Sequence, residues 1–423
     1  MKTKNITFRL LLIAFIFTYV TSCKKDQLDS QTPQSASAEK IATLNSVDEP
    51  KEMMTLAAIA MRFHDGARED LTRRMLAMSN LSTNNKWELV WYAYNERKSA
   101  QMMIVKHKDI PNTYTIASKG QHQSNIFSLI HGVHVFGREP FPWVKPGHAK
   151  PYVAEGARMI ADLLFDDIRA DAPSLNVTNG TLQDVLSAIT NKWNKNEKLN
   201  IYTTGHSLGG ANSVMIGTYV HTFFSTRKNI PDGKINLRMF NYAGPNLFRS
   251  DFVKYYNDLK KDTHINVKQY FYLIKNDVVC NFFPHNMDGL YDAFPWAWTM
   301  KIPIRLFIRG FNAGLNIGNI RYEQVGSYSD RSRIILVNKE DPNKFDVPNK
   351  IWFLDGYAAY YKYNHFTSSY LVSLGAPAVP EVENGQITTT KSSRIRTIDG
   401  DQDLHYVPTE EQINEYLKKI GAK

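Results

Sequence analysis

The stretch that decides the fold runs from Leu199 to Gly210 and reads Leu-Asn-Ile-Tyr-Thr-Thr-Gly-His-Ser-Leu-Gly-Gly. Its first half is short, apolar and rich in strand-forming residues, which predicts a strand over Leu199–Thr204. The following residues, Ala211–Phe224, contain no proline and predict a helix. Small residues flank Ser207 between them, because a strand that turns directly into a helix leaves little room for side chains. We therefore expect a tight turn that presents the Ser207 hydroxyl at a helix start, where negative charge is favoured.

Segments with the patterns of strands and helices alternate along the rest of the chain. Thr181 is followed three residues later by Asp184, a pairing typical of a capped helix start. Such alternation favours an α/β fold with a mostly parallel central sheet covered by helices on both faces. Further strands are expected at Gln101–Val105, Thr113–Ser118, Ile235–Tyr242 and Val267–Ile274, and further helices at Ala57–Met78, at Tyr152–Ala170 and from Thr181 to Trp193.

Four segments, in this order, resemble those of the class 3 lipases, a family that contains the fungal triacylglycerol lipases. Together they cover roughly Gln101 to Leu374, and the resemblance implies an α/β-hydrolase fold, cleavage of carboxylic esters through an acyl-enzyme, and no cofactor or metal. The segments are Thr204–Gly210, Tyr242-Ala243-Gly244-Pro245 (similar to Phe-Gly-x-Pro), Lys275-Asn276-Asp277-Val278-Val279 (similar to Asn-Asp-x-Val) and the histidine segment Asn364–Tyr370.

A catalytic serine needs a base that takes its proton and a carboxylate that holds the base. In this fold the three residues follow the chain order serine, acid, histidine. Asp277 directly follows the apolar strand Tyr270–Ile274 and is expected at the carboxyl end of the sheet. Asp251 and Asp288 are weaker candidates, because neither ends a predicted strand.

The expected base is His365, which lies between apolar segments near the end of the predicted folded body. His285 is the chief alternative, since it is close in sequence to Asp277. His264 and His405 are expected in a loop and in the tail. His206 is inside the turn itself and is expected to pack away from the partners of the serine.

An oxyanion hole needs two backbone N–H groups that face the developing charge. Leu208 supplies one by its position after Ser207, and Gln121, after the strand Thr113–Ser118, is expected to supply the other. Class 3 lipases usually have Arg-Gly-Thr or Arg-Gly-Ser here, whereas this chain has Lys119-Gly120-Gln121. This departure leaves a second hypothesis open, in which the same fold binds a lipid or another ligand without turnover.

The N-terminus indicates export. Lys2 and Lys4 precede the apolar run Leu10–Val20, which is shorter than the about 20 residues that span a bilayer and is typical of a signal peptide. Val20-Thr21-Ser22-Cys23 resembles the lipobox of bacterial lipoproteins, which implies acylation of Cys23 and a lipid anchor in the cell envelope. The expected organisation is a signal peptide (1–22), a polar tether (23–49), a hydrolase domain (50–375) and a tail (376–423).

The overall composition is that of a globular protein, 43% hydrophobic and 22% charged, with a formal net charge of +10. No block of Lys and Arg interleaved with aromatic residues is present, so a membrane surface is a better partner than nucleic acid. The chain has two cysteines, and if Cys23 carries lipid then Cys280 is left without a disulfide partner. Cys280 is expected to be a small buried side chain.

An apparent insertion relative to the family, at about 289–320, has two interpretations. Lys301, Arg305 and Arg309 flank a possible apolar helical face, as in a lid or a membrane-contacting helix. Ile302 and Leu306 fall on the opposite side, which instead favours a helix buried all round.

Overall fold

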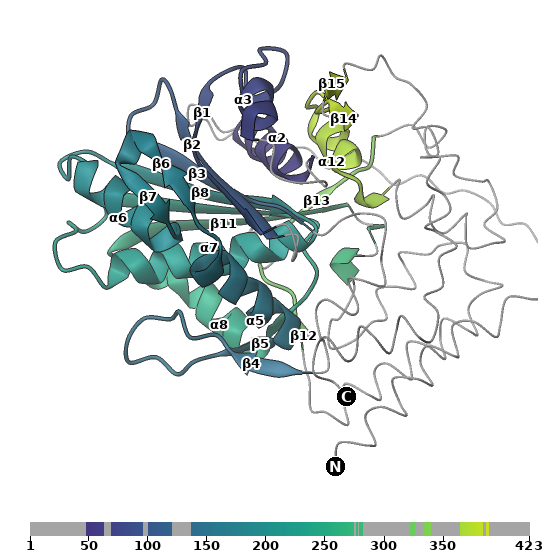
Figure 1. The fold of residues 1–423 in the computed structure, drawn as a ribbon. Helices are drawn as coiled ribbons and strands as arrows, with labels where there is room; N and C mark the ends of the chain where they lie inside the picture. Colours follow the sequence, from purple (N-terminus) through teal and green to yellow (C-terminus); the bar gives the residue numbers. More distant parts are fainter. Residues whose placement is uncertain are drawn as a thin grey trace, which may run out of the picture.

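The computed structural model describes residues 48–62, 69–95, 100–120, 137–274, 276–277, 279–281, 322–326, 333–339, 364–383 and 386–388. The core of these residues is a seven-stranded sheet with the order β1–β2–β3–β8–β9–β11–β13 (Figure 1). Neighbours from β3 to β13 are parallel, whereas β1 and β2 are antiparallel to their neighbours at one edge. The strands are β1 (Trp87–Asn95), β2 (Ala100–His107), β3 (Thr113–Ser118), β8 (Leu199–His206), β9 (Ile235–Tyr242), β11 (Ile265–Ile274) and β13 (Arg333–Leu336).

Helices cover both faces of this sheet. Two consecutive side chains on β8 show that both faces are covered, because consecutive side chains of a strand point to opposite faces of the sheet. Thr204 Oγ1 donates a hydrogen bond to Met53 O of helix α2, while Thr203 Oγ1 donates to Ser213 O of helix α7, both at 3.0 Å. The expected layered α/β architecture is therefore present.

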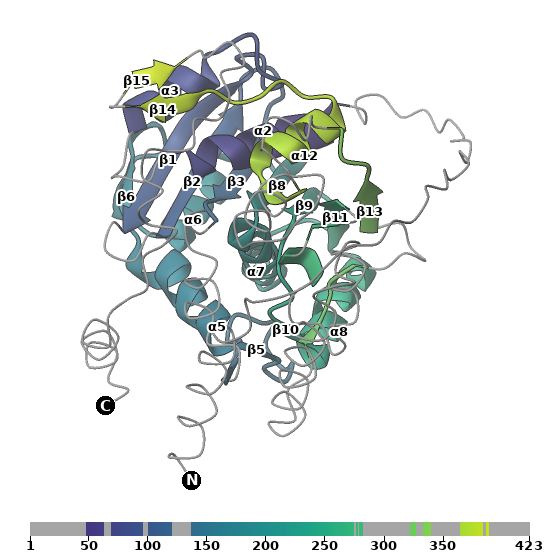
Figure 2. The same ribbon diagram turned by 90° about the vertical axis from the view of Figure 1, so that its right-hand side faces the viewer.

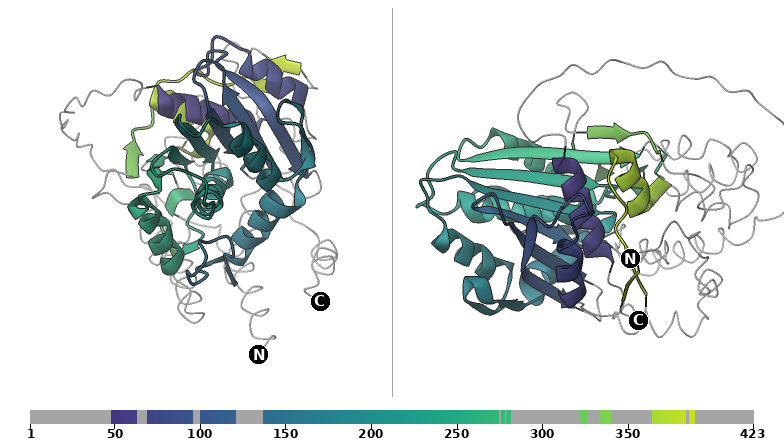
Figure 3. Two further views of the ribbon diagram at one scale, coloured as in Figure 1. Left: turned by 90° about the vertical axis from the view of Figure 1, so that its left-hand side faces the viewer. Right: turned by 90° about the horizontal axis from the view of Figure 1, so that it is seen from above.

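Helices α2, α3 and α12 lie on one side of the sheet and α5, α6, α7 and α8 on the other (Figure 1). Helix α12 lies beside α2 (Figure 2), and α2 runs across the strands when the sheet is seen from above (Figure 3). None of the helices in the described part of the chain is both long and apolar enough to cross a membrane. The helices are α2 (Glu49–Met61), α3 (Glu69–Leu76), α5 (Glu155–Asp162), α6 (Leu182–Lys192), α7 (Leu208–Ser225), α8 (Ser250–Asp258) and α12 (Thr367–Leu374).

Smaller elements surround this core. A four-stranded sheet has the order β12–β10–β5–β4, and two hairpins are formed by β6 with β7 and by β14 with β15. Their bounds are β4 (Arg138–Pro140), β5 (Tyr152–Ala154), β6 (Ala170–Ala172), β7 (Val177–Gly180), β10 (Phe248–Arg249), β12 (Tyr322–Glu323), β14 (Glu381–Glu383) and β15 (Gln386–Thr388); short helical turns are η1 (Leu163–Asp167), η2 (Pro173–Leu175), η3 (Leu259–Lys261) and η4 (Val279–Asn281).

Three expectations need correction. The helix expected over Ala57–Met78 is instead α2, which begins earlier at Glu49 and ends at Met61, followed by the separate helix α3. The segment Tyr152–Ala170 begins as strand β5, paired with β4 and β10, before α5 starts at Glu155 and a π-helical turn follows. The start of the expected tail folds as the β14–β15 hairpin, whose Val382 and Ile387 pack on the hydrophobic core.

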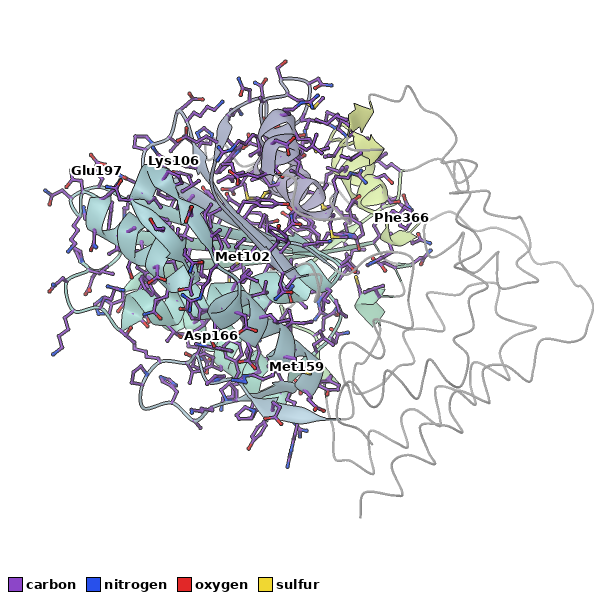
Figure 4. The ribbon with its side chains drawn as sticks, in the orientation of Figure 1. Met102, Lys106, Met159, Asp166, Glu197 and Phe366 are labelled. Carbon is purple, nitrogen blue, oxygen red and sulfur yellow. The ribbon has the colours of Figure 1, made fainter. Side chains whose placement is uncertain are left out.

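The parallel strands end at one edge of the sheet, and this edge positions the site. Phe366, the neighbour of His365, is at this edge, whereas Lys106 and Glu197 are at the opposite one (Figure 4). Because the carboxyl ends of parallel strands meet there, side chains from distant parts of the chain are brought together at this edge.

Candidate active site

The turn after β8 holds Ser207 in a strained conformation. Ser207 has φ 59° and ψ −130°, a backbone conformation that residues with a Cβ rarely adopt. It lies between the end of β8 and the start of α7. Its N–H donates to Tyr242 O at 2.9 Å on the neighbouring strand. A Cβ atom on Gly205 would lie 2.0 Å from Gly209 O, so only glycine fits at this position. The expected tight turn is present, and it presents Ser207 at the helix start.

His365 lies against this serine. The distance from His365 Nε2 to Ser207 Oγ is 2.8 Å, although the two residues are 158 positions apart in the sequence. His365 is 1% exposed and comes two residues before α12, which packs on α2. The geometry is that of a base placed to take the serine proton.

Asp277 lies behind His365. Its Oδ2 and Oδ1 are 2.8 and 3.0 Å from His365 Nδ1, and the side chain is fully buried. It follows β11 in a turn in which Asp277 N–H donates to Ile274 O at 2.9 Å and Val279 N–H donates to Asp277 Oδ1 at 2.9 Å. A carboxylate so placed fixes the imidazole tautomer with Nε2 free to accept a proton.

The competing candidates are in other places. Asp251 is in the first turn of α8, where Oδ2 accepts a hydrogen bond from Tyr152 N–H. His264 precedes β11 at the opposite edge of the sheet and pairs with Asp232. His285, Asp288 and His405 lie outside the described residues.

Tyr370 is a member of the site to which the sequence pattern assigned no role. It is on α12, fully buried, and its OH donates to Asp277 Oδ2 at 2.7 Å. The same oxygen accepts a hydrogen bond from Ile274 N–H at 3.0 Å and lies 3.7 Å from Cys280 Sγ. Burial, and next the charge of Asp277, raise the pKa of Tyr370 well above its usual value, so the phenol remains a donor. The only sequence signal was its place in the segment Asn364–Tyr370.

His206 corrects one expectation. It is a buried packing residue, but its ring does not point away from the partners of the serine: it lies 4.9 Å from the ring of His365 and 5.3 Å from that of Tyr370, between centroids. Burial, and next the proximity of His365, lower the pKa of His206 well below the usual value. A neutral His206 avoids placing a second positive charge beside His365.

The expected oxyanion donors are only partly described. Leu208 is the first residue of α7, so its N–H belongs to the helix start beside Ser207. Gln121 lies outside the described residues, as do Cys23 and the segment 289–320. Cys280 is buried, as expected. Within the described ranges, no group of three or more His, Cys, Asp or Glu side chains could hold a metal ion.

Comparisons with known proteins concern the fold and one part of the chain. Residues 140–287 match the family model of lipase (class 3). The structure of M37 lipase is similar with a TM-score of 0.55 at 19% identity, over 79% of this chain and 93% of that chain. A Rhizomucor miehei lipase propeptide complex (15% identity, 63% and 74% covered) and a lipase from Rhizopus microsporus var. chinensis (17%, 57% and 71%) each score only 0.39. Curated protein sequences contain no significant match.

The fold assignment rests on the first of these structures and on the sheet and helix layers described above. The chain has an α/β-hydrolase fold, and its residues 140–287 are similar to the class 3 lipases.

Proposed function

We propose that this protein is a serine hydrolase that cleaves carboxylic esters of lipids. The observation that carries the proposal is the chain of short contacts from Ser207 Oγ through His365 to Asp277, at the strained turn between β8 and α7. The match of residues 140–287 to the class 3 lipases supports an ester of a lipid as substrate.

Each residue then has a defined role. His365 Nε2 takes the proton of Ser207 as Oγ attacks the ester carbonyl, and Asp277 stabilises the imidazolium that forms. The Leu208 N–H, and by sequence position that of Gln121, stabilise the oxyanion. His365 returns its proton to the leaving alcohol, which leaves an acyl group on Ser207. A water molecule, deprotonated by His365, attacks this acyl-enzyme and releases the carboxylic acid.

A fluorophosphonate probe tests the nucleophile directly, because it reacts only with activated serines. The full chain, purified in detergent micelles, should be labelled, and Ser207→Ala should abolish labelling. Ser187→Ala on α6 is the matched control, since Ser187 Oγ only donates to Gln183 O and accepts from Arg227. A folded wild-type protein that is not labelled would instead favour ligand binding without turnover.

The acyl preference follows from a second measurement. The rates of hydrolysis of p-nitrophenyl esters of increasing chain length are compared with the rates for acylglycerols and phospholipids in mixed micelles. The preferred substrate assigns the substrate class. We expect rates to increase from acetate towards longer chains, whereas a preference for acetate would contradict a lipid substrate.

The proposed location is the bacterial cell envelope, with Cys23 acylated and the folded body tethered to the membrane. Metabolic labelling with an alkyne fatty acid should mark the wild-type protein and not Cys23→Ser. The wild-type protein should fractionate with membranes, and an unlabelled wild-type protein would contradict the anchor.

A further inference from the structure

The end of β3 touches the turn that carries Ser207. The parallel register pairs Ser118 with Gly205, and beyond this pair the two backbones approach closely. A Cβ atom on Gly209 would lie 2.4 Å from Ser118 O and 2.8 Å from Gly120 N, and one on Gly120 would lie 2.5 Å from His206 O. With no side chain between them, a movement of residues 118–120 is transmitted directly to the start of α7.

The peptide unit between Lys119 and Gly120 is held at both of its polar ends. Its carbonyl oxygen, Lys119 O, accepts hydrogen bonds from Asn212 Nδ2 on α7 and from Ser118 Oγ, both at 3.4 Å. Its N–H, on Gly120, donates to Met61 Sδ at the end of α2 at 2.9 Å. Because the C=O and N–H of a trans peptide point in opposite directions, these two contacts from opposite sides of the sheet fix the plane of the peptide.

The side-chain amide of Asn212 contacts the end of β3. It is 2% exposed, and its Nδ2 also donates to Ser118 Oγ at 3.1 Å. Its Oδ1 has no hydrogen-bond partner among the described residues, so the burial of this polar side chain is compensated through Nδ2 alone. Ser118 is fully buried too, and both contacts of the amide are with the end of β3.

We propose that Asn212 and Met61 are positioning residues for the oxyanion side of the site. They fix the peptide Lys119–Gly120 against the start of α7, where the Leu208 N–H is the expected oxyanion donor among the described residues. This inference rests on the proposed ester hydrolysis. Its consequence is that loss of either contact weakens stabilisation of the transition state while ground-state binding persists.

Two substitutions in the full-length protein test the inference. Asn212→Ala removes the donor on α7 to Lys119 O and leaves Ser118 Oγ as the remaining one. Met61→Leu removes the sulfur acceptor while it keeps the side-chain volume. For each we expect kcat on p-nitrophenyl butyrate to fall about tenfold with KM within about twofold. Affinity for an alkylboronic acid, which forms a tetrahedral adduct with the nucleophile, should fall by a similar factor.

A matched control separates positioning from loss of stability. Thr218→Val removes a buried hydrogen bond on the same helix, from Thr218 Oγ1 to Val214 O, away from residues 118–120. It should lower the thermal midpoint without changing kcat or boronic acid affinity. Because Asn212 and Met61 hold one peptide, the double variant should lose less than the product of the two single losses.

The outcomes distinguish the two proposals. An active wild-type protein whose Asn212→Ala and Met61→Leu variants keep wild-type kcat and boronic acid affinity overturns the positioning role only. Multiplicative losses in the double variant also overturn it, because they mean independent action. A folded wild-type protein that neither hydrolyses the ester nor binds the boronic acid overturns the ester hydrolysis itself, and the positioning role with it.

Discussion

Substitution of Tyr370 by phenylalanine removes one oxygen atom that joins three parts of the site. That oxygen donates to Asp277 Oδ2 and accepts from Ile274 N–H, and it is carried by the helix that follows His365. The phenyl ring of the variant fills nearly the same volume, so packing is retained. The change therefore removes these two hydrogen bonds and the longer contact of the oxygen with Cys280 Sγ.

The expected magnitude comes from these two contacts. A hydrogen bond to a charged group contributes about 1.5–3 kcal/mol, and a buried N–H left without a partner costs about 1–3 kcal/mol. Since Asp277 retains Val279 N–H and His365 as partners, we expect a total loss near the lower end, about 3 kcal/mol of unfolding free energy. Asp277 is then held less firmly behind His365, and we expect kcat to fall about tenfold with KM nearly unchanged.

The measurements are urea unfolding and the kinetics of p-nitrophenyl ester hydrolysis. Tyr242→Phe is the matched control, because its buried OH donates to Pro50 O at 2.6 Å, away from Asp277. It should lose about 1 kcal/mol and keep its kcat. Equal stability losses in the two variants, together with a wild-type kcat for Tyr370→Phe, would refute the role of the Tyr370 hydroxyl.

Three further predictions concern other parts of the molecule. Gly205→Ala should give insoluble or inactive protein, since its Cβ would lie 2.0 Å from Gly209 O, and a soluble variant with wild-type ester hydrolysis would contradict this. Thr181→Ala should lower the unfolding free energy by about 1 kcal/mol in urea titrations and leave kcat unchanged, because it breaks the capping box with Asp184. Burial lowers the pKa of His221 from 6.5 to about 4. Between pH 6.5 and 4 the unfolded chain therefore binds a proton at this residue and the native state does not. The unfolding free energy should decrease by up to about 3 kcal/mol as the pH drops through this range. His221→Gln should reduce the pH dependence of the unfolding free energy in urea titrations, and the buried His206 accounts for part of the dependence that remains. An unchanged slope would exclude His221 as a source.

Local sequence pattern predicted the parts of the fold that local physics determines. The strands Thr113–Ser118 and Ile235–Tyr242 have the expected bounds, and the capped start of α6 at Thr181 is confirmed. The turn at Ser207 was predictable for the same reason, because glycines on both sides are a steric requirement of the turn itself. Each of these features depends on residues close together in the sequence.

Two of the errors occur where contacts with distant parts of the chain override the local pattern. Tyr152–Ala154 fits the apolar stripe of the following helix, but it becomes strand β5 because β4 and β10 supply its hydrogen-bond partners. The β14–β15 hairpin was missed because the charged and polar composition beyond Ala376 gave no sign that Val382 and Ile387 pack on the core. Strand β1 was not predicted either, and distant pairing does not explain this error, because β1 pairs with β2, the next strand in the chain.

In the candidate site too, local motifs identify some residues, and other residues are identified only by tertiary contacts. Ser207, Asp277 and His365 each follow from a motif, because their chemistry constrains their neighbours in sequence. The contacts that hold these residues in place do not follow from a motif. Tyr370 is 93 positions from Asp277, and Asn212 is 93 positions from Lys119. A buried donor can reach its acceptor from any element that the fold brings near, so sequence pattern does not identify it. Positioning residues of this kind are therefore the ones that the three-dimensional structure adds to a motif.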